Sequence, residues 1–146
     1  MKLAFFMYTR NISNINKKPG KIGGYNKSGL PLIKKEDYEI LCGLILGDAY
    51  ISRKNTENAS LRFEQSIIHK EYLKHLFDKF GYLCTKTAVI KVAERKLFNT
   101  FSVYFVTRQL VAITELHTIF YSVASHGRKI VPQNISSLLT AKSLAY

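Results

Sequence analysis

Asp48 is the residue whose position most directly suggests chemistry, because it directly follows the C-terminal end of a predicted apolar helix. The negative end of the helix dipole disfavours an anion there by about 0.3–1 kcal/mol. A bound divalent cation would reverse that penalty, since Mg²⁺ prefers carboxylate and carbonyl oxygens. If two such helices paired, two aspartates would converge on neighbouring metal ions, an arrangement that activates water against a phosphodiester. An ordinary Gly-Asp turn is the alternative interpretation.

The helix that precedes this aspartate must be covered on every side. Glu36 and Asp37 open it near the positive end of its dipole, and Gly47 is expected to end it. No side chain is polar in the stretch 40–47 (ILCGLILG), so no face of it suits water. Gly43 lies four residues before Gly47, so the two share one face and form a smooth groove. The helix is therefore either a core helix with a bulky neighbour or an interface with a second, similar unit.

Further along the chain, the hydrophobic pattern predicts two pairs of strands separated by helices. The expected elements are a helix over 36–47, strands over 50–53 and 60–66, a helix over 69–80, strands over 86–92 and 100–107, a helix over 110–123 and a short helical tail. In the last strand, apolar Val103 and Phe105 alternate with Ser102 and Tyr104. The order α-β-β-α-β-β-α predicts an α+β fold with an antiparallel sheet.

Positive charge is concentrated at the N-terminal end. The chain has 22 Lys and Arg against 10 Asp and Glu, which gives a net charge of +12. Eight of those basic residues lie in 1–35, which contains no acid. Residues 1–31 lack hydrophobic periodicity, so we predict a flexible basic arm followed by a single domain over 32–146. Such a charge favours a polyanionic partner, most often nucleic acid and less often an anionic membrane.

The composition also bears on membrane binding, on disulfide bonds and on cellular location. No apolar run approaches the roughly 18 residues of a membrane span, so we expect no membrane partner. Cys42 and Cys84 are too few for a disulfide framework and form no metal-ligand cluster. A Lys-rich, Trp-free chain with many Ile, Asn, Tyr and Phe residues is typical of an AT-rich genome, which suggests organellar coding and a location in the mitochondrion. The basic arm could instead be a mitochondrial transit peptide.

The segment Leu41–Tyr50 (LCGLILGDAY) resembles the LAGLIDADG motif of homing endonucleases. Four motif positions are in register: Gly43, Leu44, Ile45 and Asp48. Ala49 stands where the family usually has glycine. From about Leu32 onward the chain also resembles the N-terminal half of two-motif, intron-encoded organellar members, including a Lys-Ile-x-Pro element at Lys129–Pro132. The resemblance implies a LAGLIDADG domain whose four-stranded antiparallel saddle lies in the major groove of double-stranded DNA.

The resemblance also implies roles for particular residues. It implies a site-specific DNA endonuclease in which Asp48 binds Mg²⁺ with help from the carbonyl of Gly47. Lys129 would lie by the scissile phosphate and help polarise the attacking water. The helix interface would comprise Leu41, Gly43, Leu44 and Gly47. The DNA-binding residues would be Arg53, Lys54, Arg62, Glu64, Lys91, Arg95, Ser102 and Tyr104, although a solvated strand face is the alternative for each of them.

In two-motif members, a segment like LTAKSLAY is followed by a second acidic motif, and the printed sequence ends at Tyr146 where that motif would begin. We therefore expect one half of an enzyme, because one Asp48 cannot form a site that cuts two strands. The second LAGLIDADG half would be another copy of the chain or a missing C-terminal domain. The alternatives are a non-cleaving maturase that binds intron RNA with the same saddle, and an inactive remnant.

Overall fold

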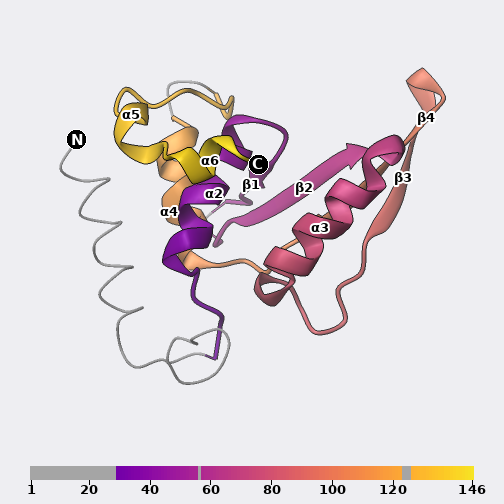
Figure 1. Cartoon of the computed structure of the whole chain (residues 1–146), viewed down its shortest axis with the longest axis horizontal. Helices are drawn as coiled ribbons and strands as arrows, with labels where there is room; N and C mark the ends of the chain where they lie inside the picture. The colour runs from indigo at the N-terminus through magenta and orange to yellow at the C-terminus, as the bar shows by residue number, and fades with distance from the viewer. Residues whose placement is uncertain (1–28, 56, 123–125) are drawn as a thin grey trace.

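The elements that carry the sequence pattern form one sheet with helices packed on it (Figure 1). The computed structural model describes residues 29–55, 57–122 and 126–146, so almost all of the predicted basic arm lies outside the described residues. In chain order the elements are α2 (Lys35–Leu46), β1 (Tyr50–Ser52), β2 (Ser60–Ser66), η1 (Ile67–His69), α3 (Lys70–Phe80), η2 (Gly81–Leu83), β3 (Lys91–Arg95), η3 (Lys96–Phe98), β4 (Thr100–Val106), α4 (Val111–Phe120), α5 (Ile135–Leu138) and α6 (Ala141–Leu144). None of the helices within these described ranges combines the length and apolarity needed to cross a membrane.

The four strands form an antiparallel sheet in the order β1-β2-β4-β3. Phe63 lies opposite Phe105 and Glu64 opposite Tyr104, which fixes the register of the central pair. Because alternate residues point to opposite faces, Phe63 and Phe105 belong to one face and Glu64 and Tyr104 to the other. The α+β fold with a four-stranded antiparallel sheet is therefore confirmed, and the sheet has one apolar and one polar face.

The helices cover the apolar face, which we call the inner face. Phe63 at the centre of the sheet stacks on Phe105 with ring centroids 4.6 Å apart and on Phe80 of α3 at 5.5 Å. Buried residues of α2 and α4 belong to the same core, among them Ile45 and Leu116. Truncating any of these large side chains to alanine would lower the free energy of unfolding by about 2–5 kcal/mol. The polar face, which we call the outer face, is left uncovered by these helices.

The third strand differs from the sequence prediction. The hydrophobic pattern predicts a strand over 86–92, but β3 begins only at Lys91 and continues to Arg95. A turn in which the Ala88 amide donates to the Thr85 carbonyl takes up the preceding residues. The position of β3 is set by the short connection to β4, where Asn99 adopts the left-handed conformation (φ 48°). The predicted range was wrong because the turn at Asn99, rather than the local hydrophobic pattern, determines which residues of β3 pair with β4.

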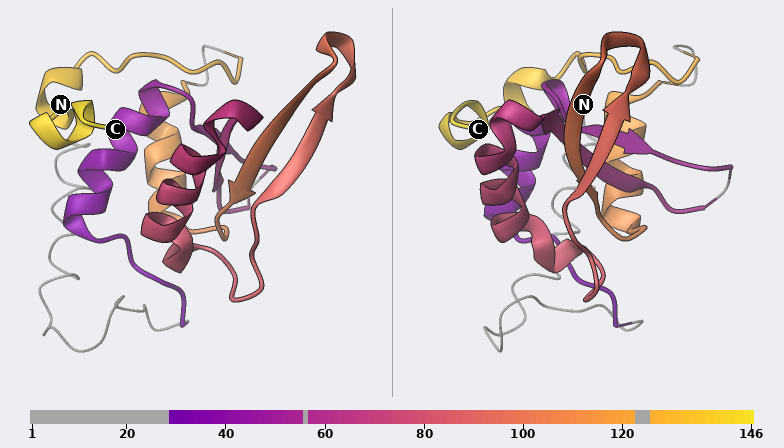
Figure 2. Two further views of the ribbon diagram at one scale, coloured as in Figure 1. Left: turned by 45° about the vertical axis from the view of Figure 1, so that its right-hand side comes forward. Right: turned by 90° about the vertical axis from the view of Figure 1, so that its right-hand side faces the viewer.

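The β3–β4 hairpin projects beyond the helical layer (Figure 2). Its tip exposes Leu97 and Phe98, while Phe101 on the inner face is also left partly uncovered. The predicted helix over 110–123 is shorter in the structure, because Tyr121 leaves α4 and forms an antiparallel bridge with Lys129. That bridge brings the segment around Lys129 back to the C-terminal end of α2.

The C-terminal helix α6 packs directly on α2, and Figure 1 shows the two together. Gly43 is the closest point, since a Cβ atom there would overlap the backbone carbonyl of Ser143. The Ser143 hydroxyl donates to the carbonyl of Glu39 at 2.8 Å, and Thr140 and Ser143 form a capping box at the start of α6. The groove predicted at Gly43 is therefore a site of close helix packing, and in this structure the helix that packs there belongs to the same chain.

Candidate active site and nucleic-acid interface

Asp48 is exposed just beyond the C-terminal end of α2. The Gln65 amide donates to Asp48 Oδ2 at 2.7 Å and fixes the direction of the carboxylate. Gln65 lies near the end of β2, on the same face as Leu61 and Phe63. Gln65 was not predicted from the sequence, although it is a polar residue at the third inward position of an otherwise apolar strand face.

Lys129 lies against the same end of α2, although it is far from Asp48 in the sequence. Its ammonium group donates to the carbonyl of Gly47 at 3.0 Å and to that of Ala49 at 2.8 Å. A cation at this position stabilises the negative end of the helix dipole and supplies a hydrogen-bond partner for two carbonyls just past the last helical residue, Leu46. Partial burial lowers the pKa of Lys129, and the nearby Asp48 carboxylate opposes that shift. The structure thus places Asp48 and Lys129 around one short turn.

A pocket of about 80 Å³ lies between α2, β2 and α3 at this point. Asp48, Gln65, Tyr72 and Tyr146 contribute to its wall. Burial raises the pKa of Tyr72, and the charge of Asp48 adds to the shift. The pocket is large enough for a few water molecules but not for a nucleotide. Any phosphodiester must therefore approach Asp48 from outside.

Some of the oxygen atoms around Asp48 are free to bind Mg²⁺, and others already accept hydrogen bonds. Gln65 uses Oδ2 of Asp48, which leaves Oδ1 for a cation. The Gly47 carbonyl already accepts from Lys129, so a metal ion would have to share that oxygen or replace the ammonium group. Across the described residues no cluster of three or more His, Cys, Asp or Glu side chains could hold a metal. One carboxylate completed by water and phosphate oxygens is nevertheless usual for Mg²⁺.

The predicted DNA-binding residues of β2 and β4 do share the outer face. Arg62, Glu64 and Tyr104 lie together there, with Arg62 Nε donating to Glu64 Oε2 at 2.9 Å. Ser102 differs from the prediction, because it is only 2% exposed and its hydroxyl donates to Glu64 Oε1 at 2.6 Å. The small Ser102 side chain lies beneath the longer side chains of neighbouring strands. It is therefore a support for Glu64 rather than an accessible contact.

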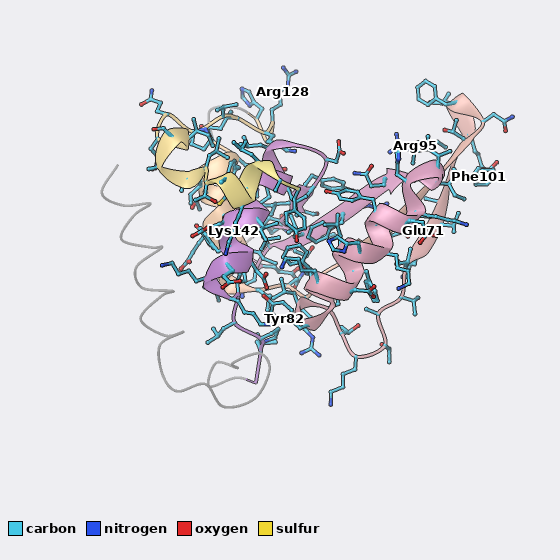
Figure 3. The ribbon with its side chains drawn as sticks, viewed as in Figure 1. Glu71, Tyr82, Arg95, Phe101, Arg128 and Lys142 are labelled. Atoms are coloured by element: carbon cyan, nitrogen blue, oxygen red, sulfur yellow. The ribbon has the colours of Figure 1, made fainter. Side chains whose placement is uncertain are left out.

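The other predicted DNA contacts are exposed but more dispersed. Lys91 and Arg95 lie on the outer face of β3, and Arg95 also reaches Glu64 Oε1 at 3.2 Å. Figure 3 shows Arg95 on the side of the projecting hairpin, far from Arg128. Arg53 and Lys54 follow β1, where Arg53 Nε donates to a backbone carbonyl at 3.0 Å. The outer face therefore presents positive groups at its β3 edge, whereas Arg53 and Lys54 lie in the loop beyond the β1 edge.

The four predicted helix-interface residues have different environments. Leu41 and Leu44 are buried in the chain's own core. Gly43 contacts α6 closely, and Gly47 is exposed beside the pocket. A second unit would therefore meet Gly47 and the outer surface of α6 first, unless α6 moved.

Residues 38–146 match the model of the LAGLIDADG DNA endonuclease family. This match spans most of the chain, so the chain belongs to that family. Among solved structures it is similar to "The homing endonuclease I-WcaI bound to its DNA recognition sequence", with a TM-score of 0.64 and 25% sequence identity. The similarity covers 77% of this chain and 49% of that one, so the chain spans about half the length of this relative.

Proposed function

We propose that this chain is a domain of a site-specific endonuclease that hydrolyses phosphodiester bonds in double-stranded DNA with Mg²⁺. The observation that carries the proposal is the meeting of an exposed carboxylate, Asp48, and an ammonium group, Lys129, at the end of the family's motif helix. A carboxylate can bind a divalent cation, and an ammonium group can neutralise a phosphate oxygen. Family membership supports DNA as the substrate.

Three side chains would contribute to hydrolysis of the phosphodiester bond. Asp48 would hold the cation through Oδ1, while Gln65 keeps the carboxylate in one orientation through Oδ2. Lys129 would hold positive charge next to the scissile phosphate and donate hydrogen bonds to it or to the attacking water. When bound, Mg²⁺ supplies Lewis-acid activation of water and of the phosphate. The small pocket beside Asp48 would hold ordered water.

A second motif-bearing unit belongs to the proposal. The chain offers one Asp48, and cutting both strands requires a carboxylate for each. The similarity to about half of a DNA-bound homing endonuclease supports this reasoning. We propose that the second unit approaches beside Gly47, the exposed interface residue next to Asp48.

Cleavage by a matched set of variants tests the proposal. The substrate is a plasmid library with randomised inserts, and the protein is the full chain joined by a flexible linker to a second copy. We expect Mg²⁺-dependent double-strand breaks from the wild type and none from Asp48→Asn, because the amide loses the charge that holds the cation. The loss should be at least about 100-fold, the scale of removing one electrostatic group from such a site. Asp78→Asn, on the exposed surface of α3, is the control and should cleave normally.

Measuring DNA and RNA binding by Asp48→Asn distinguishes a catalytic role of Asp48 from the maturase alternative. Asp48→Asn should bind DNA as well as or better than the wild type, because the substitution removes a negative charge beside a polyanion. Unchanged cleavage by Asp48→Asn would contradict the catalytic role. Absence of cleavage together with binding to intron RNA that survives Asp48→Asn would favour the maturase alternative.

A further inference from the structure

Glu64 is the one acid that the strand register places on the outer face of the sheet. Its position on a surface proposed to meet DNA is unexpected, because a carboxylate is repelled by phosphates. Its side chain is only 15% exposed, however, and both of its oxygens have partners. Oε1 accepts from Ser102 at 2.6 Å and from Arg95 at 3.2 Å, while Oε2 accepts from Arg62 at 2.9 Å. Glu64 therefore organises its neighbours and has little capacity left for a base.

Arg62 is the neighbour that this arrangement restrains most. Its guanidinium carbon lies 3.6 Å from the centre of the Tyr104 ring and 5.9 Å from that of Tyr50. Stacking on Tyr104 sets the plane of the guanidinium group, and the bond from Nε to Glu64 sets its rotation within that plane. The bond to Glu64 uses Nε, so the edge formed by Nη1 and Nη2 is directed to other acceptors. The Arg62 side chain is 24% exposed, which is enough to present that edge.

Arg95 provides an internal comparison. It uses one terminal nitrogen to reach Glu64, and its side chain is 56% exposed. An exposed pair of this kind holds its side chains weakly. Arg95 therefore suits a phosphate, which accepts a donor from many directions, whereas Arg62 is fixed in the manner that recognition of a base edge requires.

We propose that Arg62 reads a guanine in the major groove through its two terminal nitrogens, and that Glu64, supported by buried Ser102, is the positioning residue that aims it. A fixed guanidinium fork matches the O6 and N7 acceptors of guanine. Tyr104 completes the site as the surface on which the fork rests. This inference deepens the proposed function and depends on it, because it presumes that the outer face binds duplex DNA.

Selection from a random duplex library tests the inference. The wild-type chain joined to a second copy is incubated with randomised duplexes without Mg²⁺, and bound sequences are compared with those selected by Glu64→Gln and Arg62→Lys. We expect the wild type to prefer guanine at one position of each half-site. Both variants should lose that preference by about 5- to 100-fold, the usual discrimination of a bidentate pair, while preferences at other positions remain. Glu71→Gln removes an acid on α3, on the inner side of the sheet, and should select the wild-type sequences.

A control duplex of fixed sequence distinguishes the remaining results. This duplex lacks guanine at the selected position, so Glu64→Gln has no guanine contact to lose there and should bind it at least as tightly as the wild type, since the variant is less negative. Equal losses at every position, or selection identical to the wild type, would overturn the roles of Glu64 and Arg62. A wild type that binds the library but selects no guanine would also overturn them. Failure of the wild type to bind any duplex would instead refute the proposed function.

Discussion

Asp48 shows how distant residues stabilise an acid at an unfavourable place. The end of α2 repels a carboxylate, yet Gln65 donates to it and Lys129 places positive charge on the adjoining carbonyls. Asp48 could be predicted from the sequence because it breaks the helix-dipole rule, and Lys129 from the family resemblance. Gln65 could not be predicted, because the register of β2 relative to the end of α2 depends on tertiary packing.

At the residue scale, we predict that the stabilising contribution of Glu64 disappears in acid. Burial acts to raise the pKa of Glu64, but hydrogen bonds from Ser102, Arg62 and Arg95 outweigh it and hold the pKa below its ordinary value of 4.5. The ionised form therefore favours the folded state, and its contribution is present above that ordinary value and is lost as pH falls through the lower folded-state value. The difference in free energy of unfolding between wild type and Glu64→Gln should shrink as pH falls below 4.5. Urea titrations check this, and a difference independent of pH would contradict it.

At the scale of elements, the contact between α2 and α6 determines what Gly43 can tolerate. A Gly43→Ala substitution should favour helix formation by about 1 kcal/mol, but its methyl group would overlap the Ser143 carbonyl and displace α6. We expect faster amide hydrogen exchange in residues 141–146, with little change in α3. Gly81→Ala is the matched control, because its Cβ would meet open space and its backbone is already helical (φ −58°). Unchanged exchange in Gly43→Ala would show that α6 does not depend on this contact.

The elements also differ in how far the sequence predicts them. Helices α2 and α3 and strands β2 and β4 lie close to their predicted ranges, because α3, β2 and β4 have a clear apolar periodicity and α2 and α3 end near glycine. The range of β3 was displaced because a left-handed turn at Asn99 sets its pairing with β4. Ser102 alternates as an outward residue, and the register does place it outward, but alternation alone does not predict that longer neighbours bury it.

For the whole molecule, the sheet divides the chain into two chemical sides. The helices bury the inner face, while the outer face combines positive groups from β2 and β3 with the aromatic ring of Tyr104. The antiparallel fold could be predicted from strand order and family resemblance. The sequence does not predict which side chains act together on the outer face, because the Arg62–Glu64–Arg95 arrangement depends on the pairing of strands distant in sequence.

Binding of DNA by the outer face is tested by the salt dependence of affinity for a duplex of fixed sequence. We predict that affinity falls steeply with salt as bound counterions are released, and that Lys91→Ala, on the outer face, reduces the slope of log K against log salt by about 1. Lys35→Ala, at the start of α2, removes the same charge from the helical side and should leave the slope unchanged. Affinity that does not vary with salt, or equal slopes for Lys91→Ala and the wild type, would contradict binding of DNA by the outer face.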